Sequence, residues 1–269
     1  MQEYNNDPRT VLTLDAGGTN FVFSAIKGCR EVITPITIPA NADNLELSLK
    51  GMIEGFHKAK ELLNEEPVAI SFAFPGPADY PKGIIGDLGN LPAYRGGVAM
   101  GTMLEKEFNL PIFVNNDGNL YALGEAANGF LPFVNECLSK NGSSKRFKNI
   151  VGFTLGTGFG GGIVTDGRLF LGDNSDSTEL WTMSNHTKPD ENIESLISIK
   201  AVVNSYKSIT NTTQEITPKD VFEIATGKKE GDKEAALKCY EKMGRALGDA
   251  LANMLTIVDG VAVIGGGIS

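Results

Sequence analysis

The sequence predicts an α/β fold of two similar lobes, each with a mixed sheet flanked by helices. The first observation is that two glycine-rich stretches resemble each other: residues 11–26 and residues 151–164. Each stretch reads as strand, tight turn and strand, and each opens one half of the chain, as expected for an internal duplication. The second observation is that strand-like runs alternate with helical patterns between and after them. Because the hairpins pair antiparallel strands, the sheets are expected to be mixed.

The elements of the first half are predicted from the hydrophobic periodicity and from the positions of proline and glycine. Residues 32–38 read as an edge strand, since Pro35 cannot donate a ladder hydrogen bond. A helix is expected over residues 44–64, where apolar residues recur with a period of 3.6. A buried strand over 68–74 then leads into a Gly- and Pro-rich surface loop that runs to residue 97. The next expected elements are a helix over 98–108, a strand over 111–115 and a helix from within 116–119 to about residue 128.

The second half starts with a polar connection and then the second hairpin. Helices are expected over residues 192–208, from Thr217 onward and over residues 233–258, followed by a buried strand over 260–264. One face of the last helix is expected to be buried through Leu237, Tyr240, Gly244, Leu247, Leu251, Met254 and Val258. The lobe boundary is placed in the helix that ends near residue 128. The expected N-terminal lobe therefore spans residues 1–128 and the C-terminal lobe spans 129–269.

Composition excludes several classes of protein. The chain has 269 residues, and its acidic residues exceed its basic ones by 33 − 24 = 9. This balance argues against a broad nucleic-acid surface, which needs clustered Lys and Arg. No apolar run approaches the roughly 18 residues of a membrane span, and residues 1–10 lack the apolar core of a signal peptide. Three widely spaced cysteines form neither a disulfide framework nor a zinc motif, so the expected location is the reducing cytoplasm.

The first glycine hairpin is a candidate phosphate site. Glycines at the turn let backbone N–H groups approach an anion, and the turn contains Asp15, Gly17, Gly18, Thr19 and Asn20. Asp15 ends an apolar strand and is expected to hold a hydrated Mg²⁺. The alternative is an ordinary Gly-Gly hairpin without a ligand.

Two further glycine clusters strengthen the prediction of a nucleotide site. The second hairpin has neither the lysine of a Walker A loop nor the following helix of a Rossmann turn. Together with the first hairpin it is expected to cradle a polyphosphate chain, and the third cluster follows a strand where a nucleotide can be accepted. The candidate residues are Gly156, Thr157, Gly158 and Gly160 in the second hairpin and Gly265, Gly266 and Gly267 in the third cluster.

Asp117 is the candidate catalytic residue. It lies at the carboxyl end of a predicted strand, just before a helix, which is a usual place for active groups in α/β folds. A carboxylate there can accept a proton from a substrate hydroxyl. The alternative is that Asp117 only caps the helix.

Together these residues resemble the ROK family of sugar kinases and related repressors, within the actin-like ATPase fold. The resemblance covers nearly the whole chain in the expected order. Residues 14–20 and 154–162 look like the two phosphate motifs, and 116–119 look like the catalytic segment, with Gly118 where the family usually has Ala. Residues 74–79 and 89–92 look like the sugar-side loops, and residues 263–269 look like the adenosine-side motif.

The resemblance implies an ATP- and Mg²⁺-dependent kinase that phosphorylates a hexose or N-acetylhexosamine, with nucleotide and sugar in the cleft between the lobes. Asp117 would be the general base. Sugar-binding roles carry over to Gly76, Asn90, Asn116, Asp117, Glu179 and Glu194. The implied partner is a small-molecule sugar, with no nucleic acid and no membrane. Family members commonly form homodimers, and the oligomeric state of this chain stays open.

Two departures from the family pattern are visible. Thr182 stands at the position of a family His and Trp181 at that of a family Gly, which leaves specificity open. His186 lies nearby and is expected to be a surface residue. No cysteines lie between Glu179 and Glu194, so we expect no structural zinc, because such a site needs several Cys or His ligands. Packing, with Trp181 and Ile193 as candidates, is expected to hold this loop instead.

Two other functions are alternatives to the kinase. A ROK-type transcriptional regulator is disfavoured, because only ten polar residues precede the first strand and the chain is acidic. A non-catalytic sugar-binding relative is compatible with Thr182, although Asp117 and both phosphate hairpins favour catalysis. Polyphosphate as donor also stays open. Because family members continue past the third glycine cluster with helices, we expect this chain to be truncated at its C-terminus.

Overall fold

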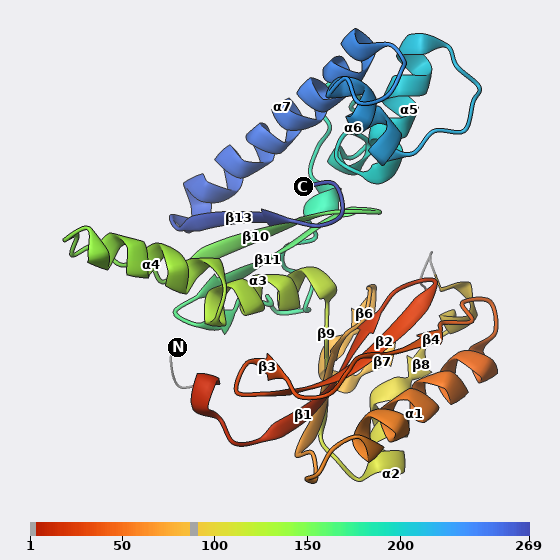
Figure 1. Ribbon diagram of the computed structural model, residues 1–269, viewed down its shortest axis with the longest axis vertical. Helices are drawn as coiled ribbons and strands as arrows, with labels where there is room; N and C mark the ends of the chain where they lie inside the picture. The colour runs from red at the N-terminus through yellow and green to blue at the C-terminus, as the bar shows by residue number, and fades with distance from the viewer. Residues whose placement is uncertain (1–3, 87–90) are drawn as a thin grey trace. The chain divides into compact units, whose positions relative to one another are not determined.

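The computed structural model describes residues 4–86 and 91–269, which divide into two units by their contacts (Figure 1). Unit 1 comprises the residues up to Leu120 together with Leu171–Ser175, and unit 2 comprises Tyr121–Phe170 and Asp176–Ser269. The division falls inside helix α3 (Asp117–Ala127), earlier than the boundary predicted at residue 128. Each unit is α/β with a mixed sheet, which confirms the predicted fold class.

The main sheet of unit 1 combines the first hairpin with two parallel strands. Strand β1 pairs antiparallel with β2 and parallel with β5, and β5 pairs parallel with β9. The short strands β3 and β4 both pair with β2, so β4 lies outside the main path of the sheet. The bounds are β1 Thr10–Ala16, β2 Asn20–Lys27, β3 Arg30–Glu31, β4 Ile36–Pro39, β5 Ala69–Ala73 and β9 Ile112–Asn115.

Two helices cover one face of this sheet: α1 (Leu45–Glu61, orange in Figure 1) and α2 (Met100–Phe108). The predicted helix at 44–64 is confirmed, and Asn44 caps it by accepting a hydrogen bond from the Leu47 N–H at 3.0 Å. Aromatic side chains dominate the core beneath α1. Phe23 and Phe56 meet edge to face with their ring centroids 5.0 Å apart.

The segment expected to be a surface loop contributes two strands to a small sheet, and the third strand takes up the first two residues of the helix predicted over 98–108. Strands β6 (Ala78–Asp79), β7 (Ile84–Ile85) and β8 (Val98–Ala99) pair antiparallel in that order. Tyr80 and Ile85 are buried in the core of unit 1. The expectation was wrong because strands of two residues are too short to show any periodicity.

Unit 2 repeats the arrangement of the first hairpin. Strand β10 pairs antiparallel with β11 and parallel with β13, just as β1 pairs with β2 and β5. Strand β12 extends the sheet beyond β11. The bounds are β10 Ile150–Leu155, β11 Phe159–Thr165, β12 Arg168–Leu169 and β13 Val261–Gly265.

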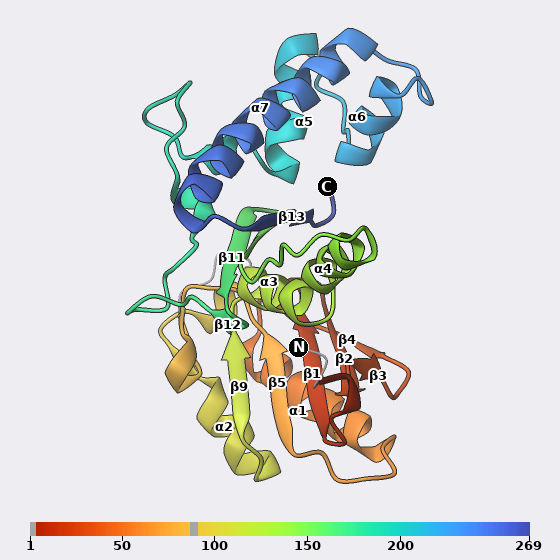
Figure 2. The same ribbon diagram turned by 90° about the vertical axis from the view of Figure 1, so that its left-hand side faces the viewer.

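Helices cover both faces of the sheet of unit 2 (Figure 2). Helices α3 and α4 (Phe130–Lys140) pack on one face, while α7 (Lys233–Val258) packs on the other. Helices α5 (Ile199–Thr210) and α6 (Pro218–Ala225) pack against α7. Gly152 allows the close approach of α3, since a Cβ there would lie 2.9 Å from the Cβ of Ala122.

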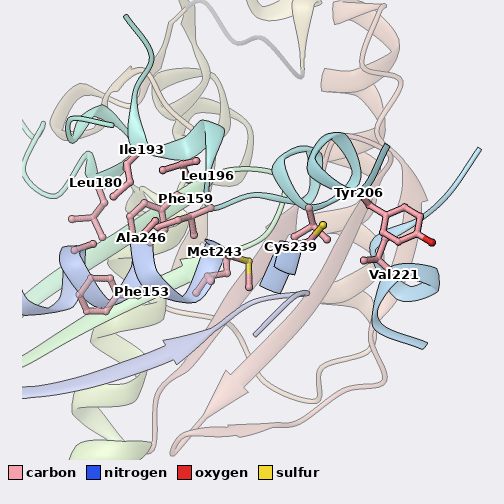
Figure 3. Close-up of a cluster of buried hydrophobic side chains, with 14 of the residues drawn as sticks. Phe153, Phe159, Leu180, Ile193, Leu196, Tyr206, Val221, Cys239, Met243 and Ala246 are labelled. Carbon is pink, nitrogen blue, oxygen red and sulfur yellow. The ribbon is translucent and has the colours of Figure 1, made fainter. Parts of the chain in front are cut away.

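The buried face of α7 agrees with the predicted one only in part: Met254 is buried, and Tyr240, Leu247, Leu251 and Val258 pack against the core. Leu237 is 50% exposed, and the face turned to the core is built mainly from small side chains. These let α7 pack closely against the aromatic side chains of the sheet (Figure 3). The buried residues of the helix are Ala235, Ala236, Cys239, Met243, Ala246, Ala250 and Met254.

The two other helices of unit 2 begin at clear caps. Helix α5 (Ile199–Thr210) starts later than predicted, after the Ser198 side chain accepts a hydrogen bond from the Ala201 N–H at 3.1 Å. Helix α6 (Pro218–Ala225) begins where predicted, with a capping box between Thr217 and Asp220. Within residues 4–86 and 91–269, none of the helices has the length and apolar character needed to cross a bilayer.

Candidate functional site

The carboxyl ends of three parallel strands meet at one edge of the sheet in unit 1. The register pairs Asp15 of β1 with Ala73 of β5, and Ala73 with Asn115 of β9. The segments that follow these strands carry the first glycine turn, Gly76 and Asp117. The fold therefore places these predicted site residues at the edge where α/β proteins usually bind ligands.

The first glycine turn is open to solvent. The Gly17 N–H donates to the Asn20 carbonyl at 3.0 Å, and a Cβ on Gly17 would lie 3.1 Å from the same oxygen. Asp15, Thr19 and Asn20 are exposed. An exposed carboxylate beside an open backbone turn fits a hydrated Mg²⁺ and a phosphate chain.

Asp117 is the first residue of α3, and its neighbour Asn116 caps the helix. The Asn116 Oδ1 accepts hydrogen bonds from the N–H groups of Gly118 at 2.8 Å and Asn119 at 3.3 Å. Asp117 is exposed, and its Oδ1 accepts from the Gly118 N–H at 2.9 Å. The alternative that Asp117 is simply the cap is therefore wrong. Its carboxylate lies at the positive end of the helix dipole and is accessible to a substrate.

Gly76 and Asn116, two predicted sugar ligands, both lie beside the hydroxyl of Tyr80. A Cβ on Gly76 would lie 3.0 Å from the Tyr80 hydroxyl, and the Asn116 Nδ2 donates to that hydroxyl at 3.4 Å. The hydroxyl itself donates to the Phe74 carbonyl at 3.0 Å. Tyr80 was missed in the sequence because its segment reads as a loop. Asn90 lies outside the described residues.

The second and third glycine clusters lie together in unit 2. The parallel register pairs Thr154 of β10 with Gly265 of β13, so both clusters follow the same edge of the sheet. Gly266 has φ +109°, and a Cβ there would collide with the Leu155 carbonyl oxygen. Glycine is thus required at Gly266 by both conformation and space. The Tyr121 hydroxyl lies beside Gly265, and burial raises the pKa of Tyr121.

The turn of the second hairpin is tight, and it is open at Gly156 and crowded at Gly158 and Gly160. The Gly156 N–H donates to the Gly158 carbonyl at 3.0 Å, and Thr157 between them is exposed. A Cβ on Gly160 would lie 2.8 Å from the Thr154 Oγ1. This arrangement fits a turn that contacts an anion through its backbone.

Glu194 is anchored to this hairpin. Its Oε2 accepts a hydrogen bond from the Phe159 N–H at 3.0 Å. A Cβ on Gly158 would lie 2.5 Å from the same oxygen, so glycine is needed for Glu194 to approach. A predicted sugar ligand therefore contacts the backbone of a predicted phosphate turn.

Glu179 pairs with Trp181 across a short 3-10 turn, Leu180–Thr182. The Trp181 Nε1 donates to the Glu179 Oε2 at 2.5 Å, and the indole is 41% exposed. The expectation that Trp181 packs inside the loop is therefore wrong. Ile193, the other candidate, is 4% exposed and lies beside Leu180 and Phe159 in the core (Figure 3).

Asn185 organises the loop between Glu179 and Glu194. Its side chain is buried; Nδ2 donates to the Ser195 Oγ at 2.9 Å, and Oδ1 accepts from the Thr187 N–H at 2.9 Å, the Thr187 hydroxyl at 2.7 Å and the Lys188 N–H at 3.0 Å. No sequence motif signals this role. In the described part of the chain, no three His, Cys, Asp or Glu side chains group to hold a metal ion, and His186 is exposed.

Comparison with known proteins identifies the family. The chain matches the ROK family over residues 11–269. It is 27% identical to a glucokinase of Halalkalibacterium halodurans (97% of this chain, 81% of that protein) and 28% identical to an N-acetyl-D-glucosamine kinase of Vibrio parahaemolyticus (95% and 83%). The crystal structure of a glucokinase from Parabacteroides distasonis superposes with a TM-score of 0.90 at 52% identity, covering 98% of this chain and 75% of that one. The chain therefore belongs to the ROK family.

Proposed function

We propose that the protein is an ATP-dependent sugar kinase that phosphorylates a hydroxyl of a hexose or N-acetylhexosamine. Its similarity to glucokinases and N-acetylglucosamine kinases supports the reaction class. The observation that carries the assignment of the base is the start of α3, where Asn116 caps the helix and leaves the Asp117 carboxylate exposed.

In this reaction Asp117 accepts the proton of the sugar hydroxyl as its oxygen attacks the γ-phosphorus. The new P–O bond forms while the bond to the β-phosphate oxygen breaks, giving sugar phosphate and ADP. Positioning and electrostatic stabilisation dominate such transfers. The sugar ligands would be Gly76, Asn90, Asn116, Glu179 and Glu194.

The glycine turns would hold the nucleotide. Those at residues 17–20 and 156–160 would contact the phosphates through backbone N–H groups, and residues 265–267 would lie on the adenosine side. Asp15 would hold Mg²⁺ through water, and the ion would neutralise charge on the phosphates. The exposed Asp15 carboxylate beside an open turn fits this role.

A panel of sugars tests the proposal directly. ADP release is measured with ATP and Mg²⁺ against glucose, mannose, fructose, N-acetylglucosamine and N-acetylmannosamine, with polyphosphate as an alternative donor. We expect turnover with at least one hexose or N-acetylhexosamine. A folded protein that binds a sugar yet releases no ADP with any of them would instead be a non-catalytic relative.

A further inference from the structure

We propose that Trp181 determines sugar specificity: its indole face supports the apolar face of the sugar ring, and its N–H orients Glu179 toward a sugar hydroxyl. This inference rests on the proposed function, because it assigns a role within the same site. Three observations support it: the hydrogen bond between Trp181 and Glu179, the well-anchored turn that contains both residues, and the exposure of the indole ring.

The hydrogen bond orients the carboxylate. The Trp181 Nε1 donates to the Glu179 Oε2 at 2.5 Å. A carboxylate is a strong acceptor for an N–H donor such as that of an indole. Because a carboxylate has two oxygens, this bond holds Oε2 beside the indole and leaves Oε1 to accept from a hydroxyl.

The turn that carries the pair is fixed at both ends. The Thr182 N–H and hydroxyl both donate to the Glu179 carbonyl, at 3.0 Å and 2.7 Å. Leu180 is buried and packs on the second hairpin, where a Cβ on Gly161 would lie 2.5 Å from the Leu180 Cδ1. The pair is therefore held in place before any ligand arrives, which lowers the entropic cost of binding.

The hydroxyl of Thr182 is already used inside the turn. It donates its one hydrogen to the Glu179 carbonyl, so it has no second hydrogen to donate to a sugar. Trp181 stands beside it, 41% exposed, where the family has Gly. The chain has thus exchanged a small residue for an aromatic surface next to a carboxylate.

This combination matches the chemistry of a sugar. A pyranose has an apolar face of C–H groups and a rim of hydroxyls. An aromatic ring can pack on the apolar C–H face, and a carboxylate can accept hydrogen bonds from the hydroxyls. A single exposed aromatic residue is common on protein surfaces. Trp181 differs because its N–H is hydrogen-bonded to Glu179, a predicted sugar ligand.

Trp181 is also a direct reporter, because it is the only tryptophan in the chain. Intrinsic fluorescence is titrated with each sugar of the panel in the absence of nucleotide. We expect a saturable change in emission with the preferred sugar. The emission should stay unchanged with sugars that are not substrates.

Three substitutions separate the ring from the N–H. Trp181→Ala and Trp181→Gly remove both, and we expect kcat/KM for the preferred sugar to fall by about tenfold while KM for ATP is unchanged. Trp181→Phe keeps a ring, so we expect it to retain more activity than the other two and to change the ratio of kcat/KM between sugars. The matched control is Phe222→Ala, which removes an aromatic residue of α6 that is 50% exposed and should leave the sugar KM unchanged.

The outcomes distinguish the inference from the proposed function. If the protein turns over a sugar but fluorescence does not respond and Trp181→Ala keeps every sugar KM, the inference is wrong while the kinase stands. If fluorescence responds and no sugar is phosphorylated, the kinase is wrong while Trp181 remains part of a sugar site. Thermal melts show whether each variant is folded.

Discussion

The Glu194 carboxylate accepts a hydrogen bond from the backbone N–H of Phe159 at 3.0 Å. Both residues lie in unit 2, and the bond joins the loop before α5 to the turn of the second glycine hairpin. A residue expected to bind sugar therefore also shapes a turn expected to bind phosphate. The two ligands are expected to depend on this one carboxylate.

Substituting Glu194 tests that dependence. Glu194→Ala removes the acceptor of the Phe159 N–H, and we expect KM to rise for both ATP and sugar, by about tenfold or more. Glu194→Gln keeps an acceptor oxygen, so it should restore the KM for ATP but not that for sugar. Steady-state kinetics with each substrate varied in turn measure both values. If Glu194→Ala changes only the sugar KM, the bond has no role in nucleotide binding.

Asp117→Asn removes the proposed base and keeps the acceptor for the Gly118 N–H. We expect kcat to fall by about 10²–10⁴-fold, while sugar binding stays within a few-fold of the parent value. Turnover is measured by ADP release and binding by calorimetry. Asp166→Asn, at an exposed position of the β11–β12 turn, serves as the control. Normal turnover in Asp117→Asn would show that another group takes the proton.

Two glycines in helices give opposite predictions for stability. A Cβ on Gly55 of α1 would collide with the ring of Phe23, so Gly55→Ala should destabilise unit 1 by about 1–3 kcal/mol. Gly244 of α7 has no atom within 4 Å of such a Cβ, so Gly244→Ala should stabilise by about 0.5–1 kcal/mol. Urea unfolding of both variants measures the free energy. Equal effects of the same sign would contradict the packing described.

The loop between Glu179 and Glu194 depends on the side chain of Asn185. Asn185→Ala leaves its buried partners unsatisfied and should cost about 1–3 kcal/mol, whereas Asn185→Asp keeps an acceptor and should cost less. Since this amide already holds the loop, EDTA should leave the melting temperature of the parent protein unchanged. A melting temperature that falls with EDTA and recovers with Zn²⁺ would show that a metal stabilises the loop.

Asp220 predicts a defined dependence of stability on pH. Its hydrogen-bonded ion pair with Lys229, and then its hydrogen bonds with Thr217, hold the pKa of its carboxyl below the usual value. A lowered folded-state pKa means that the stabilisation is complete above the unfolded pKa of about 3.9 and is lost as the pH falls through the folded value.

The stability of the parent protein should therefore exceed that of Asp220→Asn by a constant amount above about pH 5. This difference in stability should shrink below about pH 4. Because the pair is accessible to solvent, added salt should also reduce the difference. Thermal melts from pH 7 to pH 3 measure it. A difference that does not change over this range would show that the pair contributes nothing.

The sequence predicted the elements that have a strong period or a special turn. Both glycine hairpins, α1 and the start of α6 are confirmed, since each depends on local chemistry. On α7 the prediction was wrong at Leu237, which is exposed, because periodicity favours large apolar residues whereas the positions closest to the core are mainly alanines.

The arrangement of the site was less accessible from the sequence. The pairing of Trp181 with Glu179, the cap at Asn116 and the central position of Tyr80 all depend on which polar atoms the fold brings together. Composition and spacing contain no information on such contacts. The motifs indicated the segments that form the site, and the tertiary structure determines which side chains in them are partners.

The parallel pairing of β10 with β13 has a consequence for synthesis in the cell. Ile150 lies opposite Val261, so all the helices α5 to α7 must be made before this part of the sheet can close. Pairings this distant in sequence require a costly loop closure and form late. As the chain leaves the ribosome, the edge of β10 that will pair with β13 stays unpaired. Unpaired strand edges of this kind can associate with other chains. We therefore expect the open edge of this hairpin to be a place where a chaperone protects the nascent chain.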